Sequence, residues 1–282
     1  MKKINFIARS DDLASSISAN HAIDAVSRAG FIKNVSIMAP GAAVEDAAHL
    51  LAHRKDICFG MHTTLNAEWD RIKWAPVLPI GKESGLVDDN GYFLSNPSLF
   101  LETKPAVEII MREVDAQLEK LHSLGFDIKY LDSHMFPEFF IEGLDEAMAL
   151  YAKQKGLIDH MYFYNIPPGF HDLRNGLEST LNHLKILPEG QYFIVTHPSQ
   201  DTEEMRNTGN AQYSGEEIAK SRAYEAQIFS DPEVCQMLTQ LGCEGIRYDE
   251  AVPQKRATPA DFKQMFTNNN DRSTNRAEGS QS

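Results

Sequence analysis

The sequence is poor in cysteine, and the few that it has lack the spacing of a thiol site. Its 282 residues include three cysteines, Cys58, Cys235 and Cys243, none of them in a CxxC arrangement. An odd count without that spacing disfavours a disulfide scaffold and a zinc–thiolate site, and it favours a reducing, cytoplasmic location. Because each cysteine has apolar neighbours, we interpret all three as inert parts of the core.

Positive charge is also scarce, which argues against a polyanionic partner. The 27 Lys and Arg residues are outnumbered by 40 Asp and Glu residues, giving a formal net charge of -13. Nucleic-acid binding needs clustered cations, and the sequence has no basic stripe, so we expect no nucleic-acid partner. Long apolar runs are missing too, and the start MKKINFIARSDD has too few apolar residues for a signal peptide. We therefore expect no membrane partner.

What the sequence does contain is a regular succession of short apolar segments and amphipathic segments. The first sixty-odd residues predict strands at 4–7, 34–38 and 57–65, separated by helices at 17–29 and 42–53. The connections are too long for hairpins, so this β-α-β-α-β order indicates a parallel sheet with crossover helices. A hydrophobic share of 42% is enough for a substantial core, and α/β barrels reach this length as one domain.

The remainder of the chain continues this alternation after one long interruption. Helices are predicted at 105–124, 144–154, 173–184, 215–229 and 231–242, and strands at 128–131, 161–164, 192–195 and 245–248. Residues 66–101 form an irregular insertion that holds Trp69 and Trp74, and its length favours a binding loop or lid over a passive surface excursion. We divide the chain into a barrel domain, residues 1–256, and a polar, largely disordered tail, residues 257–282.

Charged and polar side chains follow several of the predicted strands at corresponding positions. Asp11 and Asp12 follow the first strand, His62 lies near the end of the third, and His134 and His197 follow two later strands. Functional groups of parallel α/β folds collect beyond the carboxyl ends of the strands. A single histidine there is more often a hydrogen-bonded structural residue than a ligand. Three histidines together with an aspartate pair favour one shared site.

These residue types suit a metal-dependent hydrolase. Two imidazoles and one carboxylate can hold a divalent ion and leave coordination positions open, and we assign Asp12, His62 and His134 as these ligands. Hydrolysis of an amide or ester also needs a group that accepts a proton and one that donates it. Asp11 is then the base, and His197 is the acid or the stabiliser of the oxyanion.

Three further residues have more than one interpretation. Asp132 could orient one of the imidazoles, or it could be a turn residue. Arg9 and Arg206 are the cations that a phosphoesterase of this architecture could use, although no Gly-rich phosphate cradle accompanies them. A catalytically silent carbohydrate-binding protein is a further alternative, but a pure binder would need neither Asp11 nor His197.

Several motifs in a fixed order give the chain a family resemblance. They are RSDDLASS with Asn20, KNVSIMAPG, GMHTTLN around His62, YLDSH at His134, VTHPS at His197, and SRAYEAQIF with Arg222 and Glu225. From about residue 4 to residue 250 the chain resembles the YdjC-like carbohydrate deacetylases. The resemblance implies an irregular, TIM-like (β/α) barrel and a divalent ion, Mg²⁺ or Zn²⁺. It also implies removal of an acetyl group from an N-acetylated sugar such as a chitooligosaccharide, with the same metal ligands, Asp11 as base, and homo-oligomers among the relatives.

The chain departs from the usual family motifs at three places. Arg9-Ser10 precedes the two aspartates where relatives usually have Asn-Ala, and Met135-Phe136 follows His134 where a second histidine is often found in a His-x-His pattern. Ser199 replaces the glycine of a His-Pro-Gly motif. No proposed ligand or base is lost, so these changes bear on the choice of substrate more than on the type of reaction.

Overall fold

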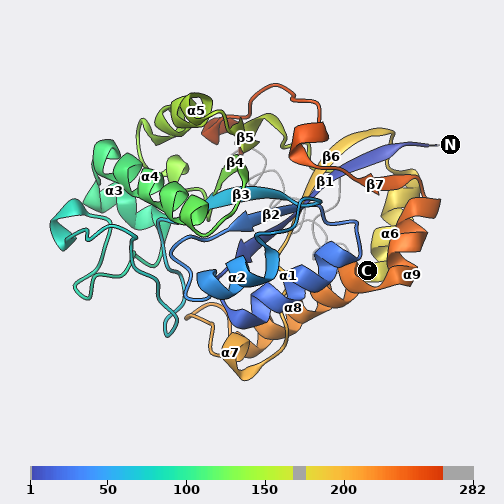
Figure 1. The fold of residues 1–282 in the computed structure, drawn as a ribbon, viewed down its shortest axis with the longest axis horizontal. Coiled ribbons are helices and arrows are strands. Elements are labelled where there is room, and N and C mark those ends of the chain that lie inside the picture. Colours follow the sequence, from blue (N-terminus) through green and yellow to red (C-terminus); the bar gives the residue numbers. More distant parts are fainter. Residues whose placement is uncertain (1, 168–175, 263–282) are drawn as a thin grey trace, which may run out of the picture.

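A computed structural model describes residues 2–167 and 176–262 of the chain (Figure 1). Its strands are β1 (Ile4–Leu13), β2 (Asn34–Ile37), β3 (Cys58–Thr63), β4 (Ile128–Ser133), β5 (Ile158–Asp159), β6 (Gly190–Thr196) and β7 (Cys243–Gly245). Its α-helices are α1 (Ile17–Arg28), α2 (Val44–Leu51), α3 (Phe100–Thr103), α4 (Val107–Ser123), α5 (Leu144–Lys155), α6 (Leu177–Ile186), α7 (Glu203–Arg206), α8 (Gly215–Ser230) and α9 (Pro232–Gln240).

The strands form one parallel sheet that curves into a half-barrel. The order is β5-β4-β3-β2-β1-β6, and β7 pairs with the first residues of β1. Beyond β5, the backbone N–H of Phe193 on β6 donates to the carbonyl of Asn165 at 2.8 Å, so the two ends of the sheet approach each other. The α/β fold and the TIM-like curvature predicted from the sequence are confirmed. All the carboxyl ends of the strands consequently meet at one rim.

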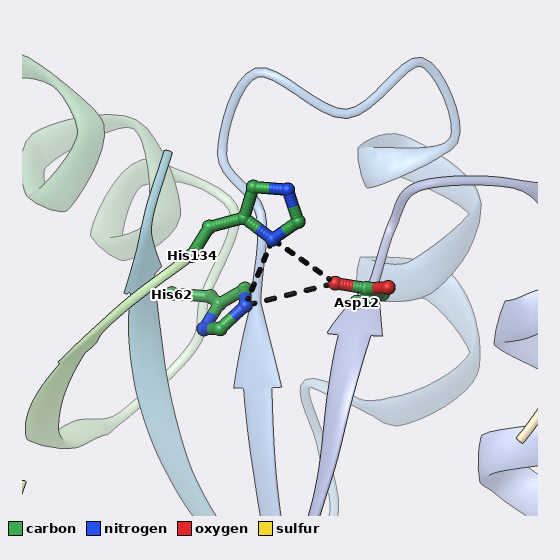
Figure 2. Close-up of side chains that lie close together, drawn as sticks. All are labelled: Asp12, His62 and His134. Atoms are coloured by element: carbon green, nitrogen blue, oxygen red, sulfur yellow. Dashed lines mark hydrogen bonds and ion pairs between the residues drawn. The ribbon is translucent and has the colours of Figure 1, made fainter. Parts of the chain in front are cut away.

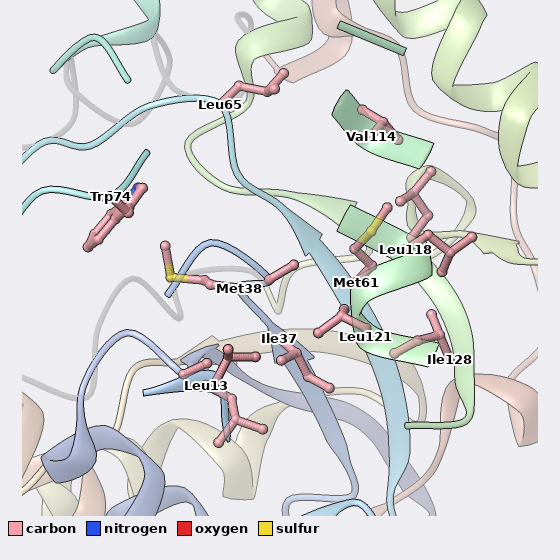
Figure 3. Packing of buried hydrophobic residues seen from close by; sticks show 14 of the residues in the cluster. Leu13, Ile37, Met38, Met61, Leu65, Trp74, Val114, Leu118, Leu121 and Ile128 are labelled. Carbon is pink, nitrogen blue, oxygen red and sulfur yellow. The ribbon is translucent and has the colours of Figure 1, made fainter. Parts of the chain in front are cut away.

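Apolar faces of the helices pack against the outside of this sheet. Ser16 begins α1 by accepting the N–H of Ala19 on its side chain, and Ala22, Ile23 and Val26 of that helix are buried. In Figure 1, α1 lies beside α2 and α8, and α4 lies beside α5. The main core joins sheet residues such as Met61 to α4 residues and to Trp74 of the insertion, as Figure 3 shows.

Two predicted strands are misplaced. Instead of a strand at 161–164 the structure has the short β5 followed by a 3-10 helix at His160–Tyr162, because the Asp159 side chain caps that turn by accepting the N–H of Met161. The last strand is Cys243–Gly245 and lies earlier than the predicted 245–248. The helix predicted at 173–184 is α6, and its first predicted residues lie outside the described part of the chain.

The insertion between β3 and α4 packs onto the core. Trp74 is 4% exposed, and its indole N–H donates to the carbonyl of Asn66. The backbone N–H groups of Val77 and Leu78 donate to the carboxylate of Glu113 on α4. Trp74 is therefore a core residue and offers no open aromatic face to a sugar, whereas Trp69 is only half-buried.

The end of the described chain returns to the barrel. The N–H of Ala257 donates to the carbonyl of Met161, and Phe262 is 1% exposed. Residues 263–282, which make up most of the tail predicted to be disordered, lie outside the described residues. Within the described ranges, no helix combines the length and the apolar character that a membrane crossing requires.

Candidate metal centre

The two aspartates at the end of β1 face the same side because the strand is irregular there. Adjacent residues of a regular strand point to opposite faces. The pairing of β1 with β2 shifts register between Ser10 and Leu13, and Asp12 has a left-handed backbone with φ 64°. Both carboxylates consequently approach the Nε2 atom of His62, Asp11 with Oδ2 at 4.0 Å and Asp12 with Oδ1 at 3.6 Å.

Asp12 at the end of β1, His62 on β3 and His134 directly after β4 converge on one point, as Figure 2 shows. Asp12 Oδ1 lies 3.4 Å from His134 Nδ1, and that nitrogen lies 3.2 Å from His62 Nε2. All three side chains are buried. Their converging atoms are one carboxylate oxygen and two ring nitrogens, the ligand types that Zn²⁺ and other divalent ions accept.

The spacing and the lack of other partners fit a metal ion. Asp12 Oδ1 is buried and makes no hydrogen bond. Burying a carboxylate oxygen without a partner is costly, so we expect a cation to bind next to this oxygen. Ligand atoms about 2.1 Å from one tetrahedral ion lie about 3.4 Å from each other. The observed separations of 3.2, 3.4 and 3.6 Å bracket that value.

Each imidazole is oriented by a carboxylate on its far side. His62 Nδ1 lies 2.9 Å from Asp132 Oδ1, and His134 Nε2 lies 2.9 Å from Glu68 Oε2. A ring N–H that donates to each of these acceptors leaves His62 Nε2 and His134 Nδ1 as lone-pair donors toward the site. These are the two nitrogens that face Asp12.

The acidic surroundings change the protonation of this centre. Burial opposes the charged form of His134, but Glu68 and Asp12 outweigh burial and raise the pKa of His134 to about 10. Burial also opposes the charged form of His62, yet Asp132 and Asp11 raise its pKa above the ordinary value. For Asp12, burial is outweighed by Arg222 and His134, which hold its pKa well below the ordinary range. In the metal-free protein an imidazolium therefore balances the carboxylates.

Arg9 neutralises a second cluster of acidic side chains, which adjoins the cluster of Asp12, His62 and His134. Asp11, His62 and Asp132 also lie close enough to share an ion. However, Arg9 donates to both oxygens of Asp11 at 2.6 and 2.7 Å and pairs with Asp132 Oδ2 at 2.6 Å. The guanidinium, 2% exposed, therefore supplies the positive charge that these two carboxylates need. The cluster with Asp12 is the better candidate for a metal.

Helix α8 holds the other side of Asp12. Arg222 Nη2 lies 2.9 Å from Asp12 Oδ2, and the guanidinium carbon lies 5.9 Å from the ring centroid of Trp69. This pair engages one oxygen of Asp12 and leaves Oδ1 directed at the two histidines. One helical turn later, the carboxylate of Glu225 accepts the backbone N–H of His197.

Comparison with known proteins places the chain in a family. The model of the family described as YdjC-like protein matches residues 5–240. The chain belongs to the YdjC-like protein family. A carbohydrate deacetylase of Thermoanaerobacter pseudethanolicus is 26% identical over 251 residues, which cover 82% of this chain and 93% of the relative. Carbohydrate deacetylase 1 of Listeria innocua is 31% identical over 149 residues, covering 52% of this chain and 57% of the relative.

Solved structures share the fold of this YdjC-like chain. A proposed cellobiose-phosphate cleavage protein of Enterococcus faecalis superposes with a TM-score of 0.71 at 18% identity, covering 88% of this chain and 98% of its own. The catalytic domain of a peptidoglycan N-acetylglucosamine deacetylase from Eubacterium rectale gives a TM-score of 0.52 at 8% identity, covering 92% and 94%. At these identities the likeness concerns the architecture alone.

The predicted site residues of the YdjC-like chain do not all lie equally close to one another. Asp12, His62 and His134 form one cluster, and Asp11 adjoins it through His62. His197 follows β6 and is half-buried, and among the groups that lower the pKa of Asp12 it comes last, after Arg222 and His134.

Two residues that touch the cluster were not predicted as part of it. Glu68 lies in the irregular insertion, where no periodicity marks one carboxylate among others. Arg222 was visible only as part of a family motif on a helix.

Proposed function

We propose that this YdjC-like chain is a metal-dependent carbohydrate deacetylase that hydrolyses the acetamide of an N-acetylated sugar, with chitooligosaccharides as the expected class. Asp12, His62 and His134 hold a divalent ion, Zn²⁺ or Mg²⁺. Asp11 accepts the proton of the attacking water, and His197 donates a proton to the leaving amine or stabilises the oxyanion.

One observation carries the proposal: a buried carboxylate oxygen without a hydrogen bond faces two oriented imidazole nitrogens in a chain related to carbohydrate deacetylases. A buried carboxylate oxygen that faces two ring nitrogens without a hydrogen bond is suited to a cation held between the three atoms. The relatives' names supply the acetylated sugar, and the ligand types supply the metal.

The residues of this chain divide the work of hydrolysis. Polarisation of the scissile carbonyl is the chemistry that a divalent ion supplies when the three ligands hold it. Arg9 fixes the carboxylate of Asp11 beside His62, so the base is held in one orientation next to the ligands. His197 approaches from β6, and the bond from its backbone to Glu225 fixes that strand end. Asp11 thus takes one proton from the attacking water, and His197, where it acts as the acid, gives a different proton to the leaving amine; proton exchange with solvent then restores both residues.

The phosphoesterase alternative loses its support in this geometry. Arg9 is buried between Asp11 and Asp132, and Arg206 pairs with Asp201 at 2.6 Å. Arg222 is engaged by Asp12. The cations that the sequence offered for a phosphate are therefore occupied by carboxylates, which favours an uncharged acetamide.

Acetate release from N-acetylated chitobiose tests the proposal. Protein loaded with Zn²⁺ or Mg²⁺ should release acetate, and chelation should stop the release until metal is restored. Asp11→Asn should abolish turnover and retain metal, whereas Asp70→Asn, a change at an exposed aspartate, should alter neither. If metal-loaded protein releases no acetate from a broad panel of N- and O-acetylated sugars, the deacetylase proposal is wrong. Loss of metal in Asp11→Asn would exchange the roles of the two aspartates.

A further inference from the structure

The backbone directly after the ligand His134 is strained. Met135 and Phe136 both have left-handed backbones, with φ 55° and 53°. Residues other than glycine, asparagine and aspartate rarely adopt this backbone conformation. Two such residues in succession persist only where surrounding contacts hold them, and strain of this kind gathers next to functional groups. The contacts that hold this pair therefore also hold His134.

Aromatic rings clamp Phe136 in place. Its ring centroid lies 4.9 Å from that of Phe139, in a stacked arrangement, and 5.2 Å from that of Phe262. Tyr164 completes the cluster, with its centroid 6.0 Å from Phe136 and 4.5 Å from Phe262. Phe262 contacts Phe136, Phe139 and Tyr164, and it is 1% exposed. It is therefore the inner member of this cluster.

Phe262 comes from a segment beyond the part of the chain that the family model matches, which ends at residue 240. That segment is tied to the barrel along its length. The N–H groups of Gln254 and Ala257 donate to the carbonyls of Tyr162 and Met161, each at 2.8 Å. Arg256 pairs with Asp145 and Asp159, each at 2.7 Å. The position of Phe262 is thus fixed independently of the 134–139 loop.

A contact of Met135, on the other side of the 134–139 loop, also connects this loop to the surroundings of His134. The amide nitrogen of Asn66 donates to Met135 Sδ at 3.0 Å and lies 3.5 Å from Glu68 Oε2. Glu68 is the carboxylate that orients His134. A shift of Met135 and Phe136 would therefore move the imidazole and disturb its partner together.

We infer that Phe262 is a positioning residue for the metal centre: by packing on Phe136 it holds the left-handed turn that aims the His134 imidazole at Asp12 and His62. This inference rests on the proposed metal site. It assigns to Phe262 a role in metal binding that is exerted through Phe136.

Zinc affinity of the metal-free protein, measured by competition with a chromophoric chelator, tests the inference without any assay of activity. Phe262→Ala should raise the dissociation constant for Zn²⁺ about tenfold. Without Phe262 the turn at Met135 and Phe136 relaxes, and restoring one strained residue when the metal binds costs about that factor in affinity. Phe262→Leu keeps much of the packing and should restore most of the affinity. If the alanine variant does not fold, a smaller but measurable weakening in Phe262→Leu supports the inference, and an affinity equal to that of the unaltered protein overturns it.

Phe126→Ala is the matched control. Phe126 is also buried against an aromatic ring, that of Phe59 at 5.2 Å, but it precedes β4 at the end opposite to His134. Both alanine variants should lower thermal stability, and only Phe262→Ala should weaken zinc binding. Unchanged affinity in folded Phe262→Ala, or equal weakening in Phe126→Ala, would overturn the inference. If the unaltered protein binds no Zn²⁺, the proposed metal site itself fails.

Discussion

At the scale of single residues, the metal centre depends on carboxylates that never touch the metal position. Glu68 and Asp132 each hold the far nitrogen of one histidine. Arg222 holds one oxygen of Asp12 and leaves the other free. These contacts fix which atoms face the site, so the three ligands need little reorganisation when a cation binds.

Replacing Glu68 by glutamine tests this role. The amide keeps the shape of the side chain but removes the charge that orients and polarises His134. We expect Zn²⁺ to bind about 10- to 100-fold more weakly, with thermal unfolding of the metal-free protein little changed. Glu102→Gln, at an exposed position of α3, is the control. Equal affinities in chelator competition for Glu68→Gln and the unaltered protein would contradict this role.

The raised pKa of His134 predicts how metal binding depends on pH. In the metal-free protein His134 carries a proton below about pH 10, whereas a ligand nitrogen must be neutral. Binding at pH 7.5 should therefore release a proton, and affinity should increase as the pH rises, by up to about tenfold per pH unit for each proton displaced. Titration calorimetry in two buffers of different ionisation enthalpy measures the release. Identical heats in the two buffers would contradict the prediction.

At the scale of elements, the strands below the site carry a buried polar layer that positions it. Tyr130 on β4 is fully buried, its ring centroid lies 4.4 Å from that of Tyr248 in a tilted arrangement, and it shares a hydrogen bond with Ser36 on β2. Ser36 also donates to Asp132. Gly60 on β3 leaves the space that the Tyr130 ring occupies, since a Cβ there would lie 2.1 Å from a ring atom.

Gly60→Ala should consequently destabilise the protein. The Tyr130 ring cannot move away, so we expect a loss of about 1–3 kcal/mol in the free energy of unfolding, measured with urea. Gly81→Ala is the matched change, because its new Cβ would meet only the carboxylate of the exposed Glu83. A stability for Gly60→Ala equal to that of Gly81→Ala would show that the ring has room to shift.

The sequence predicted the elements around the site better than the contacts between them. Apolar strands with polar residues at their ends predicted where Asp12, His62 and His134 lie, because parallel strands place those ends at one rim. The left-handed backbone of Asp12 could not be predicted, since it depends on the pairing of β1 with β2. The inward packing of Trp74 could not be predicted either, because an aromatic residue in an irregular insertion has no periodicity that shows which way it packs.

At the scale of the whole molecule, the half-barrel places an acidic site inside an acidic protein. The formal net charge is -13, and the rim carries Asp11, Asp12 and Asp132 together. Buried like charges repel, so the fold has to supply cations. Arg9 forms ion pairs with Asp11 and Asp132, and Arg222 forms an ion pair with one oxygen of Asp12. The one oxygen of these aspartates left buried without a hydrogen bond or an arginine partner is the Asp12 atom that faces the histidines.

Anomalous diffraction from crystals soaked in Zn²⁺ tests the central claim most directly. The account predicts a peak within about 2.0–2.2 Å of Asp12 Oδ1, His62 Nε2 and His134 Nδ1. A peak between Asp11 and Asp132 in its place, or no peak at the end of β1, would contradict it.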